Sequence, residues 1–244
     1  MKNAVKMCSL ALLLIGMASS ANAQFRQSVY LNGILPTGGF AKDVSSSQTD
    51  VPLEITEIGK DAALGIGASY RVSYRFDVGV GEVAPLVEAS LFWNMIGSDW
   101  REKYGDKDYT TPTYFNVPIL VGVSYFYDEL WQDITPFGEF GIGADWLKIT
   151  REGKKADESN GTLYYAYKGD IAMAWMIGAG AMFGRHVSVG LYYYGLGKHY
   201  VDYTDKTIDK NAKAKDYQEH RETGQEKRQE RSVGELALRI GFHF

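Results

Sequence analysis

The last stretch of the chain, from Ser232 to Phe244, has the clearest alternation of hydrophobic and polar positions. Every second residue from Leu236 to Phe244 is large and apolar, and the residues between them are polar or small. Successive side chains of a β-strand point to opposite faces, so one face of this stretch is apolar and the other is not. The pattern predicts a strand with two different surroundings.

Seven further stretches alternate in the same way. The predicted strands are 25–35, 64–76, 82–96, 114–127, 134–149, 170–183, 186–197 and 232–244. The second is the cleanest, because its apolar row alternates with Gly, Ser and Arg only, a row that a dry soluble core would not use. Pro118 stands in the middle of the fourth strand, where it cannot donate to a ladder, and predicts a local bulge.

The connections between these strands alternate in length. Long polar segments, predicted as loops, follow the first, third, fifth and seventh strands at 37–60, 97–112, 151–169 and 201–231. Short links follow the second, fourth and sixth. This is the plan of an outer-membrane barrel, in which both termini and the tight turns face the periplasm. We therefore predict an all-β fold, an eight-stranded antiparallel up-and-down transmembrane β-barrel, over residues 24–244.

The N-terminus predicts export. Lys2 and Lys6 precede a short apolar run, and Ala21-Asn22-Ala23 is a small-residue cleavage signal, so residues 1–23 are predicted to be a removed signal peptide. The run is shorter than the roughly 18 apolar residues that a membrane anchor needs. The one cysteine, Cys8, lies within this leader, which excludes disulfides and thiolate chemistry in the mature chain.

The formal net charge of −4 gives no reason to expect nucleic acid as a partner. The whole mature chain resembles the small eight-stranded outer-membrane barrels of the OmpA transmembrane domain, OmpX and opacity-protein group. The stretch Tyr114–Gly122 is similar to the porin-like barrels of Bacteroidetes-type bacteria. The resemblance implies outer-membrane localisation, a monomer surrounded by lipid and lipopolysaccharide, and a C-terminal strand, ending in Phe242 and Phe244, that the barrel-assembly machinery recognises. It does not imply an activity, because members include adhesins and surface antigens.

The predicted inward charges suggest how the lumen is filled. An eight-stranded barrel has room inside for side chains or one small ligand. Buried charges persist when they are paired, so we expect an ion-pair network that fills the lumen. Its predicted members are Arg71, Arg75, Glu88, Glu139, Asp145, Glu235 and Arg239. The alternatives are a narrow water path gated by those pairs, or a barrel of the OmpW kind that conducts small apolar molecules.

The sequence supports an enzyme less well than a structural barrel. His186-Val187-Ser188 has the His-x-Ser spacing of lipid A deacylases, but it follows the tight turn at Gly184 and so belongs to the periplasmic end, away from that substrate. His199 could join Asp202 and Asp205 in a protease-like site, although a loop histidine beside acids is usually solvated. No calcium-loop spacing or metal-ligand cluster is visible, and we predict no enzyme activity, cofactor or metal site.

The last long connection is rich in charges of both signs, with eight acids and eight bases from Asp202 to Arg231. Mixed charges of this kind normally indicate a solvated loop. The functional alternative is a surface that contacts host or other cell-surface ligands, to which the other long connections contribute. The sequence thus predicts a structural or surface-interaction protein.

Overall fold

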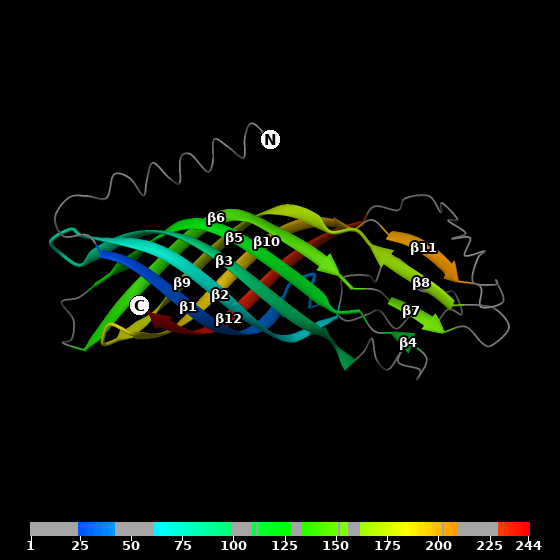
Figure 1. Cartoon of the computed structure of the whole chain (residues 1–244), viewed down its shortest axis with the longest axis horizontal. Coiled ribbons are helices and arrows are strands. Elements are labelled where there is room, and N and C mark those ends of the chain that lie inside the picture. Colours follow the sequence, from blue (N-terminus) through cyan, green and yellow to red (C-terminus); the bar gives the residue numbers. More distant parts are fainter. Residues whose placement is uncertain are drawn as a thin grey trace, which may run out of the picture.

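The computed structural model describes residues 24–41, 61–98, 109–110, 112–127, 133–150, 152–155, 162–201, 203–208 and 229–244. Eight long strands form a closed barrel, and four short strands form a second sheet beyond one of its ends (Figure 1). The barrel strands are β1 (Gln24–Thr37), β2 (Ala62–Asp77), β3 (Glu82–Ile96), β5 (Tyr114–Phe126), β6 (Ile134–Ile149), β9 (Asp170–Phe183), β10 (Val187–Val201) and β12 (Gln229–His243). The predicted signal peptide lies outside the described residues.

Each barrel strand pairs antiparallel with its neighbours in sequence, and β1 closes the barrel against β12. The seam runs from Ser28 opposite His243 to Thr37 opposite Gly234 without a register shift. The predicted fold class is confirmed. The end of the barrel where β1 begins and β12 ends, with its short connections, is called the terminal end below, and the opposite end is called the sheet end.

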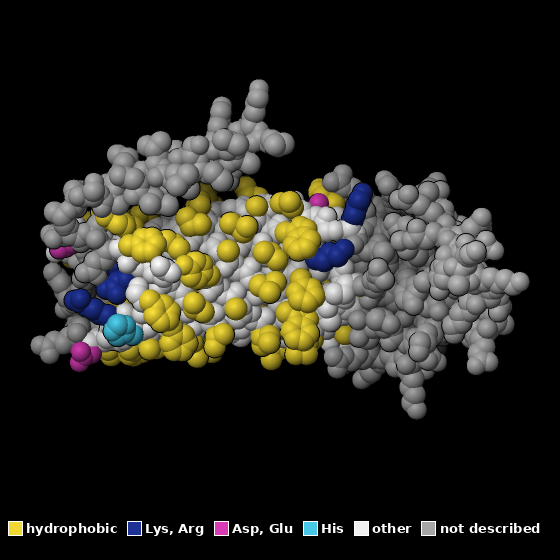
Figure 2. Space-filling model, viewed as in Figure 1, with side chains coloured by type: hydrophobic (Ala, Val, Ile, Leu, Met, Phe, Trp, Pro, Cys, Tyr) yellow, Lys and Arg dark blue, Asp and Glu magenta, His cyan; other side chains and the backbone are white. Residues whose placement is uncertain are grey.

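The outer wall is apolar around the barrel. Alternate residues of each strand point outward, and Leu31, Ile142 and Ile177 are each more than half exposed. Figure 2 shows hydrophobic side chains over the barrel wall and charged ones near the ends of this band. Exposing so continuous an apolar surface to water is unfavourable for a monomer, whereas the surface is compatible with lipid tails. No helix in the described part of the chain has the length and apolar character needed to cross a membrane.

The predicted bulge at Pro118 is wrong. Ala89 faces Ile119 and Phe92 faces Asn116, so the register of β3 on β5 is the same on both sides of the proline. The pairs between these two positions are missing from the β3–β5 ladder, whereas Pro118 stays opposite Asp145 in the β5–β6 pair. The missing N–H therefore interrupts one ladder locally, and no residue is inserted.

The polar composition of the long connections predicted loops, but three of these connections also form short strands. They contribute β4 (Tyr109–Thr110), β7 (Glu152–Lys155), β8 (Thr162–Tyr167) and β11 (Tyr203–Ile208). These form an antiparallel sheet in the order β11-β8-β7-β4, at the sheet end of the barrel (Figure 1). Three connections of the barrel thus meet in one sheet.

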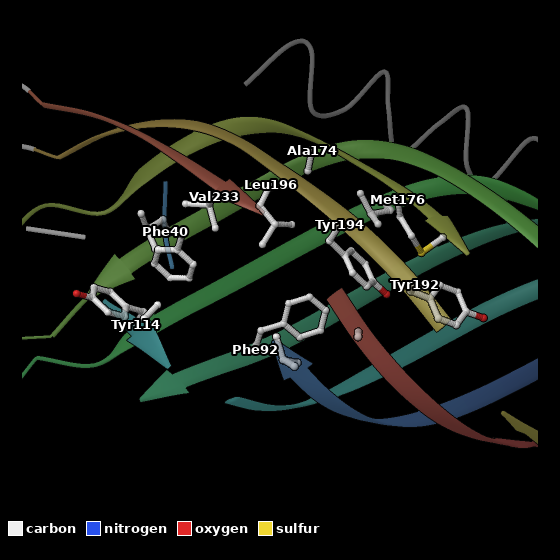
Figure 3. Packing of buried hydrophobic residues seen from close by; sticks show 14 of the residues in the cluster. Phe40, Phe92, Tyr114, Ala174, Met176, Tyr192, Tyr194, Leu196 and Val233 are labelled. Carbon is white, nitrogen blue, oxygen red and sulfur yellow. The ribbon is translucent and has the colours of Figure 1, made fainter. Parts of the chain in front are cut away.

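The interior is filled by a mixture of apolar and polar side chains. Figure 3 shows buried apolar residues from several parts of the chain, among them Phe40, Phe92, Tyr114 and Tyr194. Phe40 and Tyr114, which are fully buried, meet edge to face with ring centroids 5.1 Å apart. The large rings are accommodated by glycines on the facing strand, since a Cβ on Gly178 would collide with the ring of Tyr192.

Candidate functional site

The predicted lumen charges are brought together in part. Arg71 binds two carboxylates, with Nη2 at 2.7 Å from Glu88 Oε2 and at 2.6 Å from Glu139 Oε2. Glu88 also accepts a hydrogen bond from Arg239 Nη2 at 2.8 Å. We call these four residues the central cluster. All of them are buried, and their formal charges cancel.

Aromatic and hydroxyl groups surround the central cluster. The guanidinium carbons of Arg71 and Arg239 lie 4.8 and 4.1 Å from the centroid of the Tyr30 ring, within cation–π range. Arg239 also lies 4.5 Å from the centroid of Tyr192. The Tyr194 hydroxyl donates to Glu88 Oε1 at 3.3 Å. Sequence reasoning missed these tyrosines as site residues.

Arg75, the third predicted arginine, does not join the central cluster. Its Nη1 donates to Glu82 Oε2 at 2.9 Å, and Glu82 is partly exposed at the terminal end. Its guanidinium carbon lies 3.9 Å from the centroid of the Phe126 ring. Arg75 therefore belongs to a separate pair nearer the mouth of the barrel.

Asp145 and Glu235 also lie apart from the central cluster. Asn116 Nδ2 donates to Glu235 Oε1 at 3.2 Å, which links β5 to β12 across the lumen, because these strands are on opposite sides of the barrel. Glu235 Oε2 has no hydrogen-bond partner. Asp145 has His199 Nε2 at 3.0 Å from its Oδ2, and the backbone amides of Val117 and Trp146 lie near the same carboxylate. We call Asn116, Asp145 and Glu235 the acid level.

The sequence suggested that His199 is a solvated loop residue, and this prediction is wrong. His199 belongs to β10 and is fully buried. Its Nε2 lies 2.9 Å from the Leu196 carbonyl oxygen and 3.0 Å from Asp145 Oδ2, and its Nδ1 lies 3.7 Å from Asp170 Oδ2. The side chains of Asp202 and Asp205, the imagined protease partners, lie outside the described residues.

His186 and Ser188 do not face each other as a pair. His186 is exposed, and its Nδ1 lies 3.3 Å from the His243 carbonyl oxygen. Ser188 points inward, with its Oγ 2.8 Å from His243 Nε2, and Ser28 Oγ lies 2.8 Å from His243 Nδ1. His186 precedes β10, which begins at Val187, so its exposed side chain does not share the inward face of Ser188. Within the described residues, no three His, Cys, Asp or Glu side chains are grouped so that they could hold a metal ion.

The two C-terminal residues are hydrogen-bonded to the backbone of both neighbouring segments. Phe244 N donates to Gln27 O, and His243 N donates to His186 O, both at 2.8 Å. The rings of Phe242 and Phe244 are exposed on the outer wall. Their recognition by the barrel-assembly machinery stays a prediction.

The closed antiparallel order and the apolar outer wall decide the architecture. Strands that cross lipid must close into a barrel to pair their backbone groups, and an even number of antiparallel strands with an apolar outer band is the bacterial outer-membrane design. The fold is that of an outer-membrane β-barrel. The protein is located in the outer membrane, with lipid against its wall.

Among known proteins, the chain is similar in structure to solved outer membrane proteins at low sequence identity. Neither a family model nor a curated protein matches the chain. Among solved structures, the outer membrane protein OprG from Pseudomonas aeruginosa is 10% identical, with a TM-score of 0.41 over 92% of this chain and 96% of that one. Neisserial surface protein A is 13% identical, with a TM-score of 0.37 over 91% and 98% of the two chains. A major outer membrane protein from Thermus thermophilus is 11% identical, with a TM-score of 0.44 over 91% and 100%.

Proposed function

We propose that this barrel is a structural or surface-interaction protein, with a lumen closed by its own side chains and a binding surface formed outside by the long connections and their sheet. The observation that carries the proposal is the pairing of β4, β7, β8 and β11 at one end of the barrel, together with buried side chains that meet across its interior. A barrel that served only to conduct would have little use for either feature.

The contacts of the lumen support a closed path. The central cluster connects β2, β3, β6 and β12, so its ion pairs join strands on different sides of the wall. The link between Asn116 and Glu235 joins opposite walls at a second level. A solute would have to break both sets of contacts and move the tyrosine rings. Such rearrangement leaves a buried charge without its partner, which costs several kcal/mol.

The orientation follows the outer-membrane plan. The terminal end, with its short connections, would face the periplasm, and the small sheet would stand outside the cell. Partners on the cell exterior would then meet a sheet surface built from three connections. We propose lipopolysaccharide as the surrounding lipid of the outer leaflet and a monomeric barrel as the folded unit.

Conductance separates this proposal from its alternative, a narrow porin-like or OmpW-like conducting barrel. The purified protein is inserted into a planar lipid bilayer, and single-channel current is recorded. We expect no steady open level. Long-lived open channels would refute the closed lumen and favour the conducting barrel.

A deletion tests the surface role. Removing 204–230, as the charge pattern alone would suggest, also removes most of β11, the partner of β8. The sharper variant replaces residues 209–228 with a short Gly-Ser linker and keeps β11 and β12. We expect it to show the same heat-modifiable gel migration as the wild type and to lose adhesion to host or other cells. Unchanged adhesion of this variant and of a full deletion strain would contradict the surface role.

We also propose that the protein is not an enzyme. His186 is hydrogen-bonded to the His243 carbonyl oxygen, His243 is hydrogen-bonded to Ser188 through its ring, and Ser188 is buried. A His186→Ala variant should leave the acylation pattern of lipid A unchanged in mass spectra. A changed pattern would overturn this view.

A further inference from the structure

Three lysines lie in one sector of the outer wall, at the sheet end of the barrel. Lys148 is the next-to-last residue of β6, Lys168 comes two residues before β9 begins, and Lys198 lies near the end of β10. Lys168 and Lys198 are exposed, and Lys148 is partly exposed. Because β6, β9 and β10 are neighbours in the barrel, the three lysines belong to one continuous surface, which we call the lysine sector.

The sheet-end margin is different on β1, β2, β3 and β5. Leu35, Leu64 and Met95 are exposed there, and Phe115 stacks on the exposed ring of Trp93. Among the described residues at these four strand ends, no outward position carries a basic residue. Figure 2 shows basic side chains at the sheet-end margin of the apolar band, beside aromatic rings. Positive charge at this margin is therefore concentrated in one sector.

An apolar ridge on β9 lies within the lysine sector. Its two residues, Ile171 and Met173, are 70% and 80% exposed, whereas Trp175 on the same strand is 41% exposed. Small residues flank the ridge on both sides. Ala144 is opposite Met173 on β6, and on β10 a Cβ on Gly197 would collide with the Met173 carbonyl oxygen. The two side chains therefore stand out from a low wall, along which acyl chains can pack.

The strand register places the lysines around the sheet-end limit of the ridge. Trp146 is opposite Ile171 in the β6–β9 pair, so Lys148 is one outward position beyond the ridge toward the sheet end. Lys198 is on the other side, because the residue before it lies against the Met173 carbonyl oxygen. The charges are thus at the polar limit of the apolar band, and the ridge extends from them into it.

The acid at the start of β9 belongs to the inner face. Asp170 alternates with the exposed Ile171, and its Oδ2 accepts a hydrogen bond from Tyr200 N at 2.7 Å. The same oxygen lies 3.7 Å from Nδ1 of His199, which is fully buried. Asp170 is therefore engaged on the lumen side, and the three lysines bring positive charge to the lipid side.

We propose that the lysine sector binds one molecule of lipid A, the phosphorylated anchor of lipopolysaccharide, with its phosphates on the lysines and its acyl chains along the ridge. A lysine ammonium binds phosphate as a point charge, and its aliphatic stem lies along apolar surface. A neutral lipid would not use the lysines, and free phosphate would not use the ridge. The inference rests on the orientation proposed above, which puts the sheet end in the outer leaflet.

The test counts lipid A molecules retained by the full folded protein in detergent, using native mass spectrometry. The wall variant combines Lys148→Gln, Lys168→Gln and Lys198→Gln. The matched control combines Lys154→Gln, Lys155→Gln and Lys206→Gln, which remove the same charge from β7 and β11 of the small sheet. The wild type and the control should retain one lipid A, and the wall variant should bind it about tenfold more weakly or less, because three charges near the headgroup are lost.

A second pair of variants tests the ridge. Met173→Ala keeps the lysines and shortens the ridge, whereas Leu191→Ala removes an apolar side chain of the same wall that is 60% exposed. Met173→Ala should weaken lipid A binding, and Leu191→Ala should leave it unchanged. All variants change exposed or partly exposed positions, and unchanged heat-modifiable gel migration confirms that each has folded.

Three results would overturn the site. The first is equal loss of lipid A from the wall variant and from the small-sheet control, which would indicate general charge attraction. The second is equal retention of dephosphorylated lipid A or of phosphatidylglycerol by the wild type. The third is displacement of lipid A by inorganic phosphate alone, which would mean that the lysines bind free phosphate.

The orientation is tested separately, by antibody access on intact cells to an epitope tag inserted within 209–228. An inaccessible tag would refute the orientation and, with it, the assignment to the outer leaflet. The conductance and adhesion experiments do not depend on the lysine sector, so failure of the lipid site and failure of the surface role give different results.

Discussion

Glu88 is the residue on which the central cluster depends most. It is fully buried and accepts hydrogen bonds from Arg71, Arg239 and Tyr194. The Glu88→Gln substitution preserves the shape of the side chain and removes its charge. Arg71 keeps Glu139, whereas Arg239 loses the carboxylate to which it is bonded.

The expected cost follows from leaving one buried guanidinium unpaired. Removing one member of a buried ion pair typically lowers the free energy of unfolding by about 3–5 kcal/mol. The double variant, Glu88→Gln with Arg239→Met, removes the orphaned charge as well. We expect it to be more stable than Glu88→Gln alone by about 2 kcal/mol, because the two sites are in contact and their effects do not add.

The measurement is urea unfolding of the protein folded into lipid vesicles, followed by tryptophan fluorescence and by gel migration of unheated samples. Glu82→Gln is the control, since it breaks a similar pair with Arg75 at the partly exposed terminal end. The control should cost less than about 1 kcal/mol. A loss below about 1 kcal/mol for Glu88→Gln, or a double variant as unstable as the sum of the two single ones, would refute the reasoning.

Three further predictions test the outer wall and the packing of the interior. Ile142→Arg puts a charge on the lipid-facing wall and should lower the free energy of unfolding by about 2–4 kcal/mol, whereas Ile142→Val should change it little; equal values in the same vesicle assay would argue against lipid contact. Gly178→Val should cost about 1–3 kcal/mol, because its side chain would collide with Tyr192, and pairing it with Tyr192→Ala should recover part of the loss. Phe40→Ala removes a fully buried ring and should cost about 3–5 kcal/mol, measured by the same unfolding transition; a cost under 1 kcal/mol would show that the ring does not pack in the lumen.

Most of the barrel was predictable from the chain alone, because lipid on one side and side chains on the other impose a strict alternation. The strand 82–96 was predicted to the residue. The closing strand, predicted as 232–244, is Gln229–His243, and the larger difference is at its start, where the alternation gives way to the charged connection. Local chemistry was harder to predict. Pro118 affects one ladder and not the other, a distinction that depends on which neighbour needs its N–H.

The sequence predicted which residues point into the lumen, but not which of them contact one another. Alternation shows which side chains point inward, yet contacts across the lumen depend on strand tilt and register. For this reason the expected group of seven charges is divided among the central cluster, the Arg75–Glu82 pair and the acid level. The burial of His199 was missed because the strand extends to Val201, beyond the apparent end of its pattern. The small sheet was missed because its strands are short and lie within otherwise polar connections.

The small sheet also determines what kind of reagent can report on the exterior of this protein. Its strand β8 pairs with β7 from the same connection and with β11 from a distant one, while β4 comes from a third. Any epitope that spans these strands is therefore discontinuous. Antibodies raised against the folded protein should fail on immunoblots of boiled samples, and synthetic peptides copied from a single connection should compete poorly for them.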